Sequence, residues 1–328
     1  MWWTDWPPLR EVTMQRVLID TDPGIDDALA LLLAFASPEI KVEAITAVSG
    51  NVNVDQTSSN ALALSEFFGR PDVPVARGSA LPLVRSPIDA GYYHGKNGIG
   101  EVTLPAPREI VVAQRAVDLI VQKVLEAPGE LTLVAIGPLT NLAMALRLEP
   151  AIAQAVREVV IMGGALRSRG NVTPSGEFNI VADPHAADIV LHAGWPIRLV
   201  SLDVSNLVLL REEHIQHLRQ TRSPIAEFIK QMIDYNTTRF SASDGFTGFP
   251  MHDPLCLSAV MRPDFITWED VYVAVELQGS HTLGETVAYF PEYGTAAPHA
   301  PNVQASVRVD AEGFLEWYVE RVYRYLLR

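Results

Sequence analysis

The amino-acid sequence predicts an α/β fold, in which a single open domain is built around a mainly parallel central β-sheet flanked by helices. Two observations lead to this prediction. Short runs rich in β-branched residues, bounded by glycine, proline or charged residues, alternate with stretches of helical periodicity. The composition, with 48% hydrophobic residues over a length of 328, is sufficient for a large core. Alternating strands and helices favour a parallel sheet that is covered on both faces.

The predicted elements follow in order along the chain. A strand at 16–20 is followed by a helix at 26–37, and a strand at 41–49 is followed by a helix at 53–69. The segment at 69–107, which contains many Pro and Gly residues, is expected to form long surface loops. The later elements are helices at 112–127 and 138–150, strands at 130–136, 157–163, 197–203 and 271–277, and a C-terminal packing helix at 313–328. Ligands of such sheets bind at the carboxyl ends of the strands, so polar residues there are candidate site residues.

The chain is expected to comprise an N-terminal extension at 1–15 and one domain at 16–328. The extension is rich in tryptophan but is interrupted by Asp5 and two prolines, so it lacks the continuous apolar segment of a signal peptide. No apolar run in the sequence approaches the roughly 20 residues that cross a bilayer, which predicts no membrane partner. A single cysteine, Cys256, excludes an internal disulfide and fits a reducing cytoplasm.

The charge of the chain limits the class of ligand. The formal net charge is −14 at pH 7 and the isoelectric point is near 5.0. A nucleic-acid-binding protein presents a basic patch or stripe, so no nucleic-acid partner is expected. A small uncharged molecule such as a nucleoside or a sugar has no such requirement.

Four aspartates gather where the first predicted strand ends. Asp20, Asp22, Asp26 and Asp27 are spread over the strand end, a Pro-Gly turn and the start of the helix. Capping of the helix accounts for one or two of them, since negative charge is favoured at a helix N-terminus. It does not account for four carboxylates that repel one another. A hard cation such as Ca²⁺ or Mg²⁺ would account for them, because it is held by oxygen ligands and neutralises their charge.

The spacing of these residues separates the known metal and phosphate motifs. An EF-hand loop that begins at Asp20 requires glycine at its sixth position and glutamate at its twelfth, where the chain has Ile25 and Leu31. No Gly-rich loop closed by lysine and serine or threonine follows a strand, so the sequence contains no P-loop. A phosphoryl-transfer site with a strand-end aspartate as nucleophile stays open at this point.

A second set of polar residues follows other predicted strands. Each has an ordinary structural explanation when taken alone, as a turn residue, a surface charge, a buried histidine or a helix cap. Together they could surround one ligand at the carboxyl edge of the sheet. The residues are Asn51, Asn171, Glu177, Asn179, His252 and Asp253.

The ordered motifs of the chain resemble those of the inosine-uridine preferring nucleoside hydrolases. They extend over nearly the whole chain from Arg16, and a nine-residue signature makes the resemblance far more specific than a single glycine motif. The motifs are DTDPGIDDA, VSGN, HG, GPLTNLA, MGG, GEFN and HDP. The resemblance implies a Rossmann-like nucleoside hydrolase fold and a homodimeric or homotetrameric assembly. It also implies Ca²⁺-dependent hydrolysis of the N-glycosidic bond of purine or pyrimidine ribonucleosides, which releases the free base and ribose.

The resemblance also implies how the metal is held. The ligands would be Asp22, Asp27, Asp253 and the backbone carbonyl of Ile136, at a position where threonine is common in the family. A backbone ligand does not depend on the side chain, so isoleucine leaves the coordination unchanged. Asp26 would act as the general base on a water held by the metal.

The remaining implied roles concern the substrate. His252 would assist the departing base, either as its proton donor or as part of a proton relay, and His94 would face the base from a loop. An ungapped count back from His252 places Asn236 and Phe240 where some purine-accepting relatives have tyrosines, so Phe240 can stack on the base but has no hydroxyl. The ribose would be bound by Asn51, Asn171, Glu177 and Asn179.

Asp20 has no role as a metal ligand in this resemblance. We expect a buried supporting carboxylate, hydrogen-bonded to backbone amides of the loop or orienting the metal ligands, as is common for acids behind a metal site. Two other classes of protein stay open, a non-catalytic nucleoside-binding or ribose-binding protein and, with less support, a metal-dependent phosphohydrolase. The latter would need lysine or arginine for the phosphate, whereas the matched segments offer amides and carboxylates.

Overall fold

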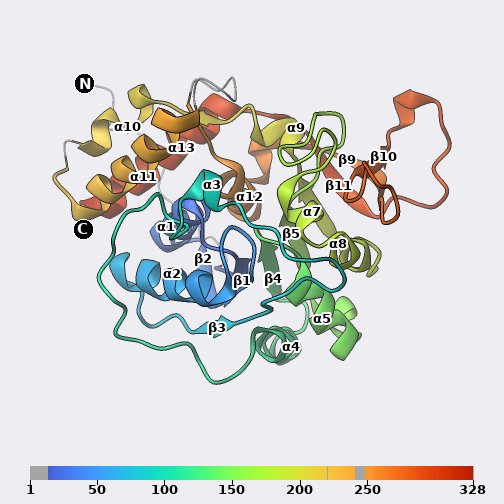
Figure 1. Cartoon of the computed structure of the whole chain (residues 1–328), viewed down its shortest axis with the longest axis horizontal. Helices are drawn as coiled ribbons and strands as arrows, with labels where there is room; N and C mark the ends of the chain where they lie inside the picture. The colour runs from blue at the N-terminus through green and yellow to red at the C-terminus, as the bar shows by residue number, and fades with distance from the viewer. Residues whose placement is uncertain (1–13, 220, 241–247, 328) are drawn as a thin grey trace.

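A nine-stranded β-sheet forms the centre of the computed structural model, which describes residues 14–219, 221–240 and 248–327, apart from the side chains of residues 217, 219 and 240 (Figure 1). Neighbouring strands of this sheet pair in parallel, except near one edge, where one strand pairs antiparallel with both of its neighbours. From one edge to the other the order is β3 (Val75–Arg77), β2 (Ile40–Ala47), β1 (Gln15–Thr21), β4 (Leu131–Ala135), β5 (Glu158–Met162), β6 (Ile197–Val200), β11 (Val303–Val309), β9 (Ile266–Val275) and β10 (Thr286–Tyr289). The α/β fold with a mainly parallel sheet that the sequence predicts is confirmed.

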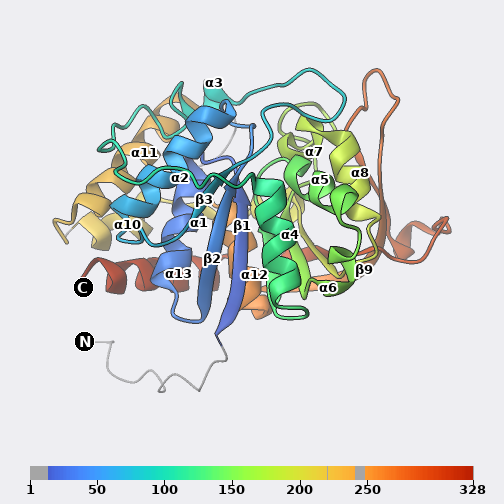
Figure 2. The same cartoon turned by 90° about the horizontal axis from the view of Figure 1, so that it is seen from below.

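Helices cover both faces of the sheet (Figure 2). The side chains of β1 alternate between two hydrophobic cores, because Val17 and Ile19 belong to one and Leu18 to the other. The first core includes α1 (Ile25–Ala36), α2 (Val54–Phe67), α12 (His252–Met261) and α13 (Ala311–Leu326). The second includes α4 (Ala116–Glu126), α5 (Thr140–Leu148), α6 (Ile152–Ala155) and α8 (Pro184–Leu191).

The remaining elements complete the described part of the chain. They are α3 (Gly91–His94), α7 (Phe178–Ala182), α9 (Leu202–Ser205), α10 (Glu212–Arg219), α11 (Pro224–Phe240), the two-stranded sheet of β7 (Leu209–Leu210) and β8 (Phe249–Pro250), and the 3₁₀ turns η1 (Pro263–Phe265) and η2 (Pro291–Tyr293). None of the helices in these described residues is long and apolar enough to cross a membrane.

The position of β1 determines where a ligand can bind. β1 pairs with β2 on one side and with β4 on the other, because the chain first builds outward to β3 and then continues on the opposite side of β1. Parallel sheets bind ligands where the strand order reverses in this way, in the crevice outside the carboxyl ends of the strands. Asp20 is the penultimate residue of β1, and Asp22 follows the strand directly, at this crevice.

Some elements differ from the prediction. The predicted strand at 271–277 overlaps β9, which begins earlier and is antiparallel to its neighbours. The predicted surface loop at 69–107 contains β3 and α3, which are too short to give a periodic signal. Most of the predicted N-terminal extension, residues 1–13, lies outside the described residues, and β1 begins at Gln15.

Candidate active site

The turn between β1 and α1 folds the first aspartates around backbone amides. Gly24 caps α1, and its N–H donates to Oδ2 of Asp27 over 2.8 Å. The hydroxyl of Thr21 also donates to the Asp27 carboxylate. Nδ2 of Asn51, from the loop after β2, reaches the same carboxylate at 3.1 Å. Asp27 is therefore held in one orientation by the turn and by a neighbouring strand end.

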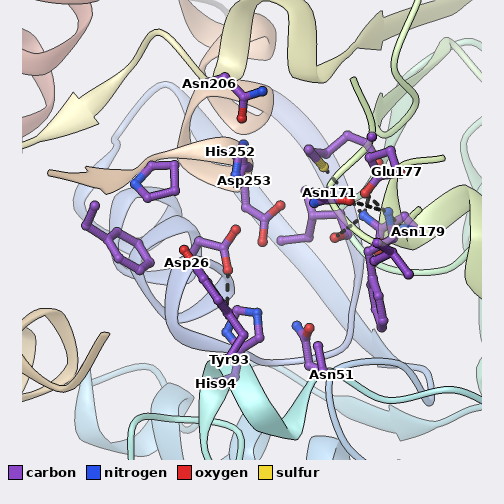
Figure 3. A pocket seen from close by; sticks show the side chains of 18 of the residues that line it. Asp26, Asn51, Tyr93, His94, Asn171, Glu177, Asn179, Asn206, His252 and Asp253 are labelled. Carbon is purple, nitrogen blue, oxygen red and sulfur yellow. Dashed lines mark hydrogen bonds and ion pairs between the residues drawn. The ribbon is translucent and has the colours of Figure 1, made fainter. Parts of the chain in front are cut away.

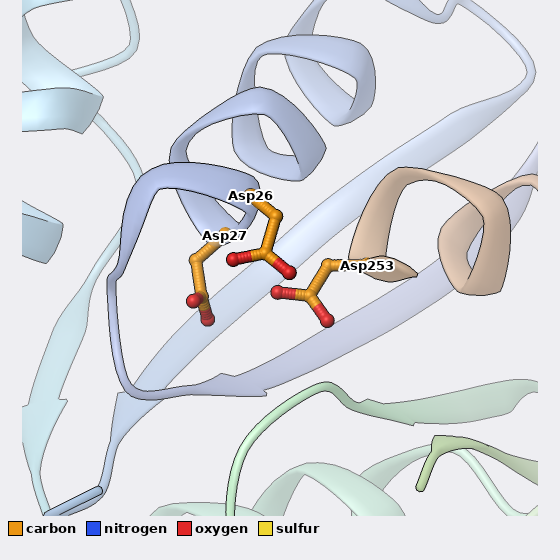
Figure 4. A group of neighbouring side chains, drawn as sticks. All are labelled: Asp26, Asp27 and Asp253. Carbon is orange, nitrogen blue, oxygen red and sulfur yellow. The ribbon is translucent and has the colours of Figure 1, made fainter. Parts of the chain in front are cut away.

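Asp253 joins this cluster from a distant part of the chain. It lies in the first turn of α12, which packs against α1. Carboxylate oxygens of Asp26, Asp27 and Asp253 all lie within 4.8 Å of one another, and Figure 4 shows the three carboxylates together at the starts of α1 and α12. All three residues are buried, so their negative charges face one another away from bulk water.

Asp22 lies beside the cluster in a tight backbone pocket. Its Oδ2 accepts the backbone N–H of Asn51 at 2.6 Å, whereas its Oδ1 is buried and has no hydrogen-bond partner among the described residues. Glycines surround the carboxylate: a Cβ on Gly50 would lie 2.0 Å from Oδ2, and one on Gly137 would lie 2.5 Å from Oδ1. The backbone here leaves room for the carboxylate only because both neighbours lack side chains.

The buried carboxylates of the cluster repel one another, and a bound cation would stabilise them. Burial and then the charge of Asp27 raise the pKa of Asp26 to about 8 and the pKa of Asp22 well above its usual value. The pKa of Asp253 is likewise raised by burial and by the charges of Asp26, Asp27 and Asp22. A divalent cation would remove this repulsion and lower these pKa values. The donors are all oxygens, one of them without a partner, so the residues fit a hard cation such as Ca²⁺.

Asp20 is buried near the end of β1 and links neighbouring elements by hydrogen bonds. Its Oδ1 accepts hydrogen bonds from the hydroxyl of Thr46 and, at 2.8 Å, from Nδ2 of Asn141. The donors are therefore side chains, whereas backbone amides of the loop were one of the two expectations from the sequence. Burial raises the pKa of Asp20 to about 7. Nδ2 of Asn141 also donates to the carbonyl of Ala47, so the carboxylate ties the ends of β1 and β2 to α5.

We expect Asp20→Ala to weaken Ca²⁺ binding by about 10–100-fold, the usual effect of removing a group that orients metal ligands. The substitution removes the acceptor of the buried Thr46 hydroxyl and one of the two acceptors of the Asn141 amide, which loosens the strand ends next to the expected metal ligands. Asp20→Asn is the matched control, because it keeps an acceptor oxygen. Calorimetric titration with Ca²⁺ measures the effect, and an unchanged affinity of Asp20→Ala would remove the supporting role.

Three of the four ribose-binding residues expected from the sequence, Asn171, Glu177 and Asn179, lie together on one side of the cavity, and Asn51 lies apart from them toward His94 (Figure 3). Glu177 caps α7, and its two carboxylate oxygens accept the backbone N–H groups of Gly164, Asn179 and Ile180 at 2.9–3.1 Å. Nδ2 of Asn179 donates to the carbonyl of Ile136 at 3.0 Å, which places this amide beside the carbonyl expected to bind the metal. Oδ1 of Asn171 accepts the N–H of Phe178 at 2.9 Å and so closes the loop before α7.

Two histidines approach the cavity from other directions. Nδ1 of His94 accepts the backbone N–H of Ile25 at 3.1 Å and lies 3.9 Å from Oδ1 of Asp26. Burial, followed by the charge of His252, lowers the pKa of His94 to about 3. Nδ1 of His252 lies 2.8 Å from the hydroxyl of Ser205, and burial lowers its pKa to about 4. Both rings are therefore neutral at neutral pH.

These groups line one cavity of about 540 Å³ at the carboxyl edge of the sheet. Seven of the residues expected from the sequence to touch the substrate or act in catalysis line it, together with two of the expected metal ligands. They are Asp26, Asn51, His94, Asn171, Glu177, Asn179 and His252, with Ile136 and Asp253. The side chain of Phe240 lies outside the described residues. Asn236 is buried and donates to the carbonyl of Tyr93 at 3.4 Å.

Further lining residues were missed by the sequence reasoning. Asn206 follows β6 and α9, so the rule that polar residues gather after parallel strands could have found it. Tyr93 precedes His94, and Phe249 lies in β8, where no local pattern distinguishes a cavity residue from a core residue. Arg169 is the one lysine or arginine among the described lining residues.

The arrangement is suited to breaking a bond to an uncharged sugar. Carboxylates of the cavity wall can stabilise positive charge and accept a proton, and its amides can bind hydroxyls. The neutral imidazole of His94 lies beside Asp26, and that of His252 lines the same cavity.

Comparisons with known proteins agree with this chemistry. A family model described as inosine-uridine preferring nucleoside hydrolase matches residues 17–316. The chain is 39% identical over 308 residues to uridine nucleosidase 1 of Arabidopsis thaliana, covering 92% of this chain and 91% of the relative. It is 38% identical to the pyrimidine-specific ribonucleoside hydrolase RihA of Citrobacter koseri, with 93% and 97% covered.

Solved structures show the same fold. The purine-preferring ribonucleoside hydrolase from Gardnerella vaginalis superposes with a TM-score of 0.89 at 31% identity, over 95% of this chain and 99% of that one. A plant nucleoside hydrolase, the PpNRh1 enzyme, superposes with a TM-score of 0.88 at 34% identity, over 94% and 98%.

Proposed function

Because the chain belongs to the inosine-uridine preferring nucleoside hydrolase family and is thus a hydrolase of N-glycosyl bonds, we propose that it cleaves ribonucleosides with Asp26 as general base and His252 assisting the departing base. The observation that carries this proposal is the convergence of Asp26, Asp27 and Asp253 at a cavity lined by amides. Such a floor suits a neutral sugar better than an anion.

We assign the metal-binding role to Asp22, Asp27, Asp253 and the carbonyl of Ile136. Oδ1 of Asp22, which has no hydrogen-bond partner in the described part of the chain, and the close approach of Asp27 and Asp253 support this set. A bound Ca²⁺ would supply the positive charge that orients ribose hydroxyls and lowers the pKa of the attacking water.

We assign the general-base role on the attacking water to Asp26. It lines the cavity, whereas Asp27 does not, and the Asp27 carboxylate is already oriented by hydrogen bonds from Thr21, Gly24 and Asn51. As the water attacks C1′, Asp26 accepts one of its protons, a new C–O bond forms and the C1′–N bond breaks. Positive charge develops on the ribose during this step, and the neighbouring carboxylates stabilise it.

The ribose and the base would lie on different sides of these carboxylates. Asn51, Asn171 and Asn179 offer amides for ribose hydroxyls, and Glu177 holds the loop that carries two of them. The base leaves with negative charge. His252 and His94 can donate hydrogen bonds to it until it takes up a proton, which balances the proton released from Asp26.

The test is a hydrolysis panel of ribonucleosides and nucleotides, with products separated by chromatography, in the presence of Ca²⁺ and of a chelator. Uridine is the first substrate to test, because two relatives of 38–39% identity are named for uridine or pyrimidines, and inosine follows because a structural relative is named for purines. Release of free base and ribose supports the proposal. Phosphate release from nucleotides would indicate a phosphohydrolase, and binding without turnover would indicate a nucleoside-binding protein.

We expect 2′-deoxyribonucleosides to be poor substrates, with kcat/KM at least about tenfold below that of the matching ribonucleoside. The physical reason is that a buried site built to bind a hydroxyl has unpaired polar groups when the hydroxyl is absent. Uridine and 2′-deoxyuridine form the matched pair, compared by initial rates of base release. Equal kcat/KM values would show that the 2′-hydroxyl is not bound. The cytoplasmic location and the homodimeric or homotetrameric assembly stay predictions.

A further inference from the structure

Ser205 is a fully buried residue whose hydroxyl lies against His252, which lines the cavity. It ends α9, directly before Asn206, and its hydroxyl oxygen lies 2.8 Å from Nδ1 of His252. His252 itself begins α12, and its ring lines the cavity close to Asn206 (Figure 3). The hydroxyl thus stands behind the ring, on the edge that carries Nδ1.

The direction of this hydrogen bond follows from the surroundings of the hydroxyl. A serine in a helix can donate to the carbonyl four residues earlier, as Ser37 and Ser58 do here. Ser205 makes no such bond, and Nδ1 of His252 is the partner of its hydroxyl in the described part of the chain. A buried hydroxyl hydrogen without an acceptor is costly. The hydroxyl therefore donates to Nδ1.

This donation determines the tautomer of His252. A ring nitrogen that accepts a hydrogen bond carries no hydrogen, so in His252 the hydrogen is on Nε2, at the opposite edge of the ring. A hydrogen on Nδ1 would leave the serine hydroxyl without an acceptor among the described residues. His94 is fixed in the same tautomer by the backbone N–H of Ile25, which can only donate. The tautomer of His252 is thus set by a side chain, which a substitution can remove, whereas that of His94 is set by a backbone N–H, which a substitution of the side chain leaves in place.

We propose that Ser205 is a positioning residue for catalysis, whose hydroxyl holds His252 in the tautomer and orientation that present Nε2–H to the departing base. The inference rests on the proposed function, because it requires that His252 meets a leaving base. No proton passes through Ser205. Its hydroxyl keeps its own hydrogen throughout, and the role is to keep Nδ1 from carrying one.

The test compares two leaving groups in Ser205→Ala. We expect kcat for uridine or inosine, whichever the wild type hydrolyses faster, to fall about 10–100-fold, as for other residues that orient a functional imidazole. For 4-nitrophenyl β-D-riboside, whose leaving group departs as a stable anion, we expect kcat to stay within about twofold, because it needs no hydrogen bond from Nε2. A purely structural role would lower both rates equally.

Three further variants make the result decisive. Ser205→Thr keeps a hydroxyl and should restore most of the nucleoside rate. Ser258→Ala removes another buried serine hydroxyl, which donates only to a backbone carbonyl within α12, and should leave both rates unchanged. In a His252→Ala background, Ser205→Ala should cause no further loss, because both changes remove the same interaction.

The outcomes separate this inference from the proposed function. If the wild-type protein hydrolyses neither nucleosides nor the nitrophenyl riboside, the proposed function fails. If it hydrolyses nucleosides but Ser205→Ala does so at the wild-type rate, or loses both substrates equally, the positioning role of Ser205 is overturned. A further loss in the His252→Ala background would overturn it as well.

Discussion

Asp26→Asn is expected to lower kcat for ribonucleoside hydrolysis by about 10²–10⁴-fold, the range that a positioned general base contributes. The substitution keeps the size and most polar contacts of the side chain but removes its capacity to accept a proton. Oδ1 of Asp26 lies 3.9 Å from Nδ1 of His94, and the residue borders the cavity. Initial rates of base release at saturating substrate measure the effect.

Asp118→Asn is the matched control for this prediction. Asp118 occupies the first turn of α4, as Asp26 does of α1, but it pairs with Arg115 and does not line the cavity. Its replacement should leave kcat unchanged. A ribonucleoside kcat of Asp26→Asn within about tenfold of wild type would assign the base to another group.

Removal of Ca²⁺ by a chelator is expected to abolish hydrolysis and to destabilise the fold. Without the cation, buried carboxylates repel one another, and the pKa values of Asp22, Asp26 and Asp253 are raised well above the ordinary range. Ca²⁺ at 100 times its dissociation constant would stabilise the folded state by about 2.7 kcal/mol. Readdition of Ca²⁺ should restore the activity.

Cys256 offers a direct measure of this stabilisation. It is the single cysteine of the chain, it is fully buried in α12, and burial raises the pKa of its thiol. A thiol reagent therefore reacts only when the protein opens. Under the same conditions, Ca²⁺ should slow this reaction about 100-fold, provided that the opening is rapidly reversible. In Asp253→Asn, Ca²⁺ should have little effect, whereas equal protection of this variant would place the cation elsewhere.

The first aspartates could be predicted because local sequence positions them. Asp22, Asp26 and Asp27 lie on one strand end and one helix start, so a strand, a Pro-Gly turn and a helix bring them together whatever the rest of the chain does. The mainly parallel sheet could also be predicted from the sequence, because alternating strands and helices leave few other arrangements. The antiparallel pairing of β9 with β10 and β11 could not be predicted, because the residue pattern of a strand does not reveal the direction in which it runs.

The distant contacts of the site could not be predicted from patterns. Asp253 reaches Asp26 because α12 packs on α1, and Asn141 reaches Asp20 because α5 follows the strand beside β1. Nothing local to these residues encodes either contact, and only the family resemblance placed Asp253 near the metal. The role of Ser205 could not be predicted, because a serine at the end of a short helix is common, and only the structure places it beside the His252 ring.

The most direct test of the account is a crystal structure of the Asp26→Asn variant with Ca²⁺ and a bound ribonucleoside. We predict one Ca²⁺ within about 2.3–2.6 Å of oxygens of Asp22, Asp27, Asp253 and the Ile136 carbonyl, with ribose hydroxyls completing its coordination and the base beside Nε2 of His252. A cation bound outside these carboxylates, or a nucleoside whose ribose lies away from them, would contradict the account.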